Sequence, residues 1–75
     1  MDAHQRKQAS ERILSDPIFN EAWDALKEEI MVNWVNSNDT DIETRERLWL
    51  SLKYLNRLKS HFENIVTTGK MEQRL

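Results

Sequence analysis

The densest run of chemically active side chains in this sequence is a basic segment in its C-terminal half. Residues 47–62 contain Lys53, Arg57 and Lys59 and no acidic residue. Lysine and arginine bind phosphate groups, and aromatic rings lie close by, so these three residues are candidate phosphate or nucleic-acid contacts. On a helix, residues 53 and 57 share a face, whereas residue 59 points elsewhere. The alternative is that the segment complements acidic residues of the same chain.

A row of acidic residues offers a second candidate chemistry. Glu21, Asp24 and Glu28 follow one another at i, i+3 and i+7, which places three carboxylates on one helix face. Such a row can bind a metal ion or exchange protons. A metal site inside a helical bundle, however, uses inward-facing carboxylates joined by histidine in a Glu-x-x-His spacing, which is absent here. We therefore expect a solvated helix face, with no metal and no cofactor.

Catalysis by a nucleophile and a base is not indicated either. The two histidines, His4 and His61, are far apart in the chain and neither lies in a catalytic motif. Gly69 and Lys70 do not form a phosphate loop, because the preceding glycine of that motif is absent. The chain has no Cys, which excludes disulfides and thiolate metal sites. The sequence predicts a protein that is not an enzyme.

Length and composition set the next limits. A chain of 75 residues forms one domain at most, and folded alone it buries only about 60% of its unfolded surface. Scaffolds of this size usually need a disulfide, a metal or another subunit, and oligomerisation is the option left here. No run of 18 apolar residues is present, so we expect no membrane span. The absence of Cys fits a cytoplasmic location.

Capping residues predict two helices in the first half of the chain. A short helix over residues 2–14 ends before Asp16-Pro17, since the residue that precedes a proline disfavours helical geometry. A second helix covers residues 17–36. Ser15 or Asp16 caps it, and Pro17 suits its first position, where the missing N–H is no loss.

The second half of the chain predicts one long helix. Thr40-Asp41-Ile42-Glu43 matches a capping box, in which the threonine hydroxyl and the glutamate carboxylate bind each other's free backbone N–H groups. The helix then covers residues 41–68, Gly69 supplies a left-handed cap, and residues 70–75 form a mobile tail. A five-residue loop makes the two long helices antiparallel. The expected fold is all-α, a long antiparallel helical hairpin with a short N-terminal helix.

The apolar residues outnumber the places where a single copy of this hairpin could bury them. The second helix carries an apolar stripe formed by Phe19, Trp23, Leu26, Ile30 and Trp34. Residues 30–35 are apolar nearly all round, which is typical of burial on more than one side. The long helix carries a wide leucine-rich seam with further apolar residues beside it. We therefore expect a homo-oligomer. The candidate interface residues are Trp34, Trp49, Leu50 and Tyr54. The alternatives are that Trp34 belongs to the core and that Trp49 packs under the first helix.

The charges are unevenly distributed along the chain. Residues 16–43 carry one basic and eight acidic side chains, whereas residues 44–75 carry seven basic and three acidic ones. Antiparallel pairing brings residues 21–29 near residues 53–61. Acidic and basic side chains of the two long helices are therefore expected to lie side by side and to help fix their orientation.

Several short motifs resemble a group of small helical proteins encoded by tailed bacteriophages and prophages. The resemblance covers roughly residues 10–70, and its motifs are helix caps and apolar positions. It implies a phage-encoded protein that acts in the cytoplasm of a bacterial host or in the virion, among the head and DNA-packaging genes. The matching segments are Asp16-Pro17-Ile18-Phe19, Ala22-Trp23, Trp34, Arg45-Glu46-Arg47-Leu48-Trp49 and Thr68-Gly69-Lys70.

The function expected from the sequence is therefore non-enzymatic association. The chain would bind itself and another phage or host protein, either as a virion or assembly component or as an inhibitor of a host protein. The alternative is a nucleic-acid or small-nucleotide binding protein that uses Lys53, Arg57 and Lys59.

Overall fold

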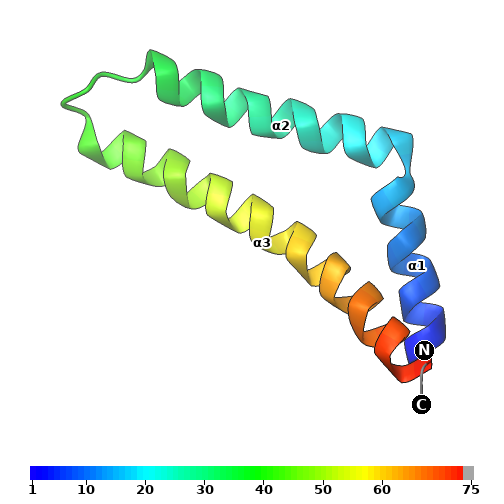
Figure 1. Ribbon diagram of the computed structural model, residues 1–75. Coiled ribbons are helices and arrows are strands. Elements are labelled where there is room, and N and C mark those ends of the chain that lie inside the picture. The colour runs from blue at the N-terminus through cyan, green and yellow to red at the C-terminus, as the bar shows by residue number, and fades with distance from the viewer. Residues whose placement is uncertain (74–75) are drawn as a thin grey trace.

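The fold is all-α, and the expected helical hairpin with a short N-terminal helix is confirmed. A computed structural model describes residues 1–73 and contains, within that range, three helices and no strand: α1 (Ala3–Ser15), α2 (Pro17–Asn36) and α3 (Ile42–Gln73). Helices α2 and α3 form the two arms of the hairpin, and α1 connects the start of α2 with the far end of α3 (Figure 1). No helix of this range is both long and apolar enough to cross a membrane.

The break between α1 and α2 lies where the sequence predicts it. The Asp16 carboxylate accepts hydrogen bonds from the backbone N–H groups of Ile18, at 2.8 Å, and Phe19, at 3.0 Å. Pro17 occupies the first position of α2, where a backbone N–H would have no helical partner. Asp16 is thus the cap of α2, and α1 ends at Ser15, one residue later than predicted.

The cap of α3 differs from the predicted capping box by one residue. The Asp41 carboxylate accepts a 3.1 Å hydrogen bond from the backbone N–H of Thr44. The hydroxyl and the backbone N–H of Thr44 lower the pKa of the Asp41 carboxyl below its ordinary value. Thr40 instead donates its hydroxyl to the side-chain oxygen of Asn38, and Glu43 pairs with Arg47. Asp41 replaces the predicted threonine because a carboxylate accepts such bonds more strongly than a hydroxyl.

The difference in helix length explains the position of α1. At 1.5 Å per residue, α3 is about 48 Å long and α2 about 30 Å, so α3 extends roughly 18 Å beyond its neighbour. Helix α1, about 20 Å long, matches this overhang. Residues near its start, Met1, Ala3 and Arg6, border the same shallow cleft as Ile65 and Thr68 of α3. Helix α1 therefore covers the part of α3 that α2 does not reach.

The predicted end of α3 at Gly69 is wrong. The helix continues through this residue to Gln73, so residues 70–73 are helical and not a tail, while residues 74 and 75 lie outside the described range. No glycine or other residue of the described range has a positive φ, which excludes a left-handed cap. Gly69 is buried, and a Cβ atom on it would lie 2.6 Å from the Cβ of Lys7. The glycine serves to let α1 and α3 approach each other closely.

The buried core is small for a chain of this size. Trp23, which is 7% exposed, and Ile30, 8% exposed, are the buried apolar side chains of the described range, and both belong to α2. The Phe19 ring forms a tilted pair with the Trp23 ring and a T-shaped pair with the Phe62 ring, each at a centroid distance of 5.9 Å. Leu26 of the predicted stripe is about half exposed. The radius of gyration, 16.4 Å, exceeds the roughly 11 Å of a compact domain of this length.

Candidate interaction surface

Helix α3 presents a shallow groove on the side that faces away from α2. We call this groove the outer α3 surface. It contains three of the four predicted interface residues and two of the three predicted phosphate contacts. Its lining consists of Trp49, Leu50, Lys53, Tyr54, Asn56, Arg57 and Ser60.

Helical geometry explains why these residues share one side of α3. The inward side of the helix is formed by Leu48, Leu52 and Leu55, which are all partly buried. Each residue turns the helix by about 100°, so Trp49 and Lys53 follow Leu48 by roughly 100° and 140°. The inward stripe therefore determines which residues of α3 form the outer α3 surface.

The outer α3 surface exposes three large apolar or aromatic side chains next to its polar residues. Trp49 is 47% exposed, Leu50 41% and Tyr54 64%. The Lys53 ammonium nitrogen lies 4.3 Å from the centroid of the Trp49 ring, a cation–π contact within the surface itself. The Lys53 ammonium thus lies over the indole ring, and about half of the Trp49 side chain stays exposed. Large aromatic side chains in this state are frequent anchors of protein–protein interfaces.

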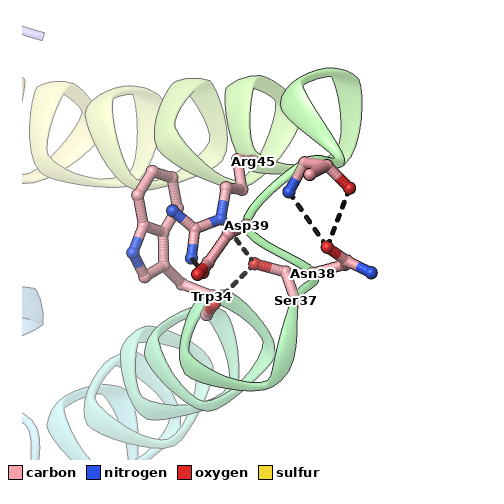
Figure 2. Close-up of polar contacts among 6 residues, drawn as sticks. Trp34, Ser37, Asn38, Asp39 and Arg45 are labelled. Carbon is pink, nitrogen blue, oxygen red and sulfur yellow. Dashed lines mark hydrogen bonds and ion pairs between the residues drawn. The ribbon is translucent and has the colours of Figure 1, made fainter.

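Trp34, the fourth predicted interface residue, lies apart from the outer α3 surface. It is partly buried near the loop, and the Arg45 guanidinium lies 4.9 Å from its ring centroid (Figure 2). Arg45 also donates to the Ser37 hydroxyl and to the Asp39 carboxylate, each at 3.0 Å. The Ser37 hydroxyl in turn donates to the Trp34 carbonyl at 2.6 Å. Trp34 and Arg45 therefore tie the loop to both long helices.

Lys59 also separates from the other two predicted phosphate contacts. Its ammonium nitrogen lies 5.8 Å from the Trp23 ring centroid, and its side chain is partly buried. Lys53 and Arg57, in contrast, are exposed on the outer α3 surface. The structure thus brings residues 53 and 57 together and directs residue 59 toward α2, as the helical spacing indicates.

The expected pairing of charges between α2 and α3 is not found among the described side chains. Their ion pairs join Lys7 to Glu11, Asp39 to Arg45 and Glu43 to Arg47, and none of these connects α2 with α3. The acidic residues of α2 are exposed instead: Glu21, Asp24, Glu28 and Glu29. The described range also contains no group of three or more His, Cys, Asp or Glu residues placed to hold a metal ion.

Helix α2 carries a second uncovered apolar patch near the loop. Met31, Val32 and Val35 are exposed and border a shallow groove with Glu28 and Asn36. The apolar run over residues 30–35 indicates that this end of α2 has more apolar surface than one chain can bury, but it does not show which residues stay exposed. The helical rotation of about 100° per residue, counted from Trp23, Ile30 and Trp34, would have identified these three residues.

Asn56 and Ser60 are further members of the outer α3 surface that the sequence alone does not single out. Both are small polar residues, and only their helical spacing from Trp49 and Lys53 relates them to the groove.

Compared with known proteins, the chain matches no protein-family model, no curated protein and no solved structure.

Proposed function

We propose that this protein is a non-enzymatic helical interaction protein that works as a homo-oligomer and binds through the outer α3 surface. The observation that carries the proposal is the exposure of Trp49, Leu50 and Tyr54 on one helix face. A lone chain leaves these side chains in water at a cost of about 25 cal/mol per Å² of apolar surface. Association removes that cost.

The total accessible surface supports association. The chain exposes 6044 Å², whereas a compact monomer of 9.0 kDa exposes about 4,900 Å². The excess is roughly 1,100 Å². A specific interface of ordinary size covers about 800 Å² of each partner. The chain thus carries more spare surface than such an interface needs.

The mass in solution tests this proposal. Light scattering at micromolar concentration is expected to give a multiple of the 9.0 kDa chain mass. The measured mass should rise with concentration, because the folded monomer and the oligomer are linked by mass action. A mass of 9.0 kDa at every concentration would contradict the homo-oligomer.

The resemblance to phage-encoded proteins gives the proposal a biological setting. In that setting the chain is a virion or assembly component, or an inhibitor of a host protein, and a second protein binds the assembled oligomer. Co-purification from the native host, followed by mass spectrometry, identifies this protein. A variant that lacks Trp49 serves as the control, since a specific partner must be lost with the surface that binds it.

A second candidate function rests on Lys53 and Arg57. Both cations are exposed on the same face as Trp49 and Tyr54, an arrangement that suits phosphate contact with base stacking. An affinity for an oligonucleotide that falls steeply with salt, and that is lost when both cations become glutamate, would support nucleic-acid binding.

A further inference from the structure

The exposed residues Met31 of α2 and Trp49 of α3 lie on the same side of the hairpin. Met31 follows the buried Ile30 by one residue, and Trp49 follows the partly buried Leu48 by one residue. Each step is a rotation of about 100° in the same sense along its own helix. Ile30 and Leu48 belong to the stripes by which α2 and α3 face each other. Because the two helices are antiparallel, equal rotations away from these stripes turn Met31 and Trp49 toward the same side of the hairpin. We call this side the open face.

Charged residues extend the open face on both helices. Glu28 follows Trp23 by five residues and Lys53 follows Leu48 by five residues, a rotation of about 140° in each case. Both side chains are exposed, and no ion pair among the described side chains joins their helices. The α2 half of the open face therefore carries Asp24 and Glu28, with Lys27 beside them about 40° from Trp23. The α3 half carries Lys53 and Arg57, with Glu46 beside them.

The register of the hairpin sets which residues share a level. Phe19 faces Phe62, Trp23 faces Lys59 and Trp34 faces Arg45. Residue numbers at one level thus add up to about 80. Three pairs follow from this relation: Met31 with Trp49, Glu28 with Lys53, and Asp24 with Arg57. Val35 lies one turn away from the level of Trp49.

Helix α1 leaves the open face free. The residues of α3 that border α1 include His61 and Ile65. His61 precedes the inward-facing Phe62 by one residue, which is a rotation opposite to that of Trp49. Helix α1 thus lies on the other side of α3, and at its far end, so it covers neither Trp49 nor Met31.

We propose that the open face binds a second copy of this chain, with α2 of each copy packed on α3 of the other about a two-fold axis parallel to the helices. This inference rests on the proposed function and names its partner. A rotation about such an axis keeps the level of every residue and exchanges the two helices. Glu28 then meets Lys53 of the second copy, Asp24 meets Arg57, and Met31 packs against Trp49.

The pairing is self-complementary, as a two-fold interface must be. Met31 meets Trp49 near the loop, and Asp24 and Glu28 meet Arg57 and Lys53 toward the middle of the helices. Each helix lies antiparallel to both of its neighbours, as in an up-down four-helix bundle. In such a bundle each helix has two neighbouring helices, in directions about 90° apart around its axis. This angle agrees with the rotation of about 100° between the inward stripe of each helix and the open face.

Reversal of charge on one half of the open face tests this arrangement. The variant Lys53→Glu/Arg57→Glu places acid against acid in both halves of the dimer, and Asp24→Lys/Glu28→Lys places base against base. Each variant alone should dimerise about 10- to 100-fold more weakly than the wild-type chain, measured by sedimentation equilibrium at low salt. An equimolar mixture should form a heterodimer, because each substituted residue then faces a residue of opposite charge in the other variant.

The matched control carries the same change of net charge as Lys53→Glu/Arg57→Glu, but on a different surface. Arg6 and Arg12 of α1 are exposed and lie outside the open face, so Arg6→Glu/Arg12→Glu should dimerise like the wild-type chain. Unchanged dimerisation of both charge variants, or a mixture that stays monomeric, would overturn the two-fold arrangement. If the wild-type chain still associates in that case, the proposed function stands without it. A wild-type chain that is always monomeric would overturn both.

Discussion

Replacement of Trp49 by alanine should weaken self-association by about 2–4 kcal/mol, or roughly 30- to 1000-fold in the dissociation constant. The indole is 47% exposed in one chain, and its described cation contact comes from Lys53 on the same surface. Removing it therefore leaves no cavity in the intramolecular core. Helicity should be unchanged, since alanine favours helices more than tryptophan does. Sedimentation equilibrium and circular dichroism measure the two effects separately.

Ile18→Ala is the control for this variant. Ile18 is also an exposed apolar residue, 71% accessible, but it lies at the start of α2 and outside the outer α3 surface. Its replacement should leave the dissociation constant unchanged. If Trp49→Ala unfolded the chain, the indole would belong to the core and not to the interface. If it left association unchanged, another surface would have to hold the oligomer together.

Gly69→Leu should lower the free energy of unfolding by about 2–3 kcal/mol, because a side chain at this position cannot fit between α1 and α3. A Cβ atom there would lie 2.6 Å from the Lys7 Cβ, whereas carbon atoms in contact prefer about 3.5–4.0 Å. The Lys7 Cβ is attached directly to the backbone of α1, so the whole helix must shift. The higher helix propensity of leucine returns only about 1 kcal/mol. Urea denaturation at one fixed protein concentration measures the difference.

Two further variants separate the close approach from other effects. Thr67 is exposed on the same helix, so Thr67→Leu should change the stability by less than about 0.5 kcal/mol. The double variant Lys7→Gly/Gly69→Ala moves the glycine from α3 to α1. Its free energy of unfolding should be higher than the sum of the two single-variant changes predicts. Gly69→Leu with wild-type stability would show that α1 does not pack against this turn of α3.

Local chemistry made α2 and the hairpin register predictable. Pro17 and the Asp16 carboxylate determine where α2 begins, because one lacks a backbone N–H and the other binds two free ones. The position of Trp23 on the apolar stripe predicts its burial, which is confirmed. The short loop makes the arms antiparallel, and the contact of Trp23 with Lys59 agrees with the predicted pairing of residues 21–29 with residues 53–61.

The docking of α1 could not be read from apolar periodicity. Its most buried residue is Ser10, whereas Ile13 is partly exposed. A small residue is buried here because α1 and α3 approach closely, and the same approach explains Gly69. A glycine near the end of a predicted helix fits a left-handed cap and a helix contact equally well, and only the position of α1 decides between them.

The candidate surface was predictable only in part for a similar reason. Trp49, Leu50 and Tyr54 fall off the leucine seam, so their shared exposure follows from spacing alone. Trp34 and Lys59 have the residue types expected of interface and phosphate contacts, as Trp49 and Lys53 do. Within the chain, however, Trp34 is in contact with Arg45, and Lys59 with Trp23. The acidic and basic helices do not pair within one copy, because their charged residues turn toward the sides and not toward each other.

Protection of a single thiol on the open face tests most directly whether this surface is buried on association. The chain has no Cys, so Asn56→Cys places a unique reactive group within the outer α3 surface, and Gln8→Cys places one on exposed α1. The labelling rate at position 56 should fall as the protein concentration rises, in proportion to the associated fraction, while the rate at position 8 stays constant. A rate at position 56 that is the same in monomer and oligomer would contradict the account.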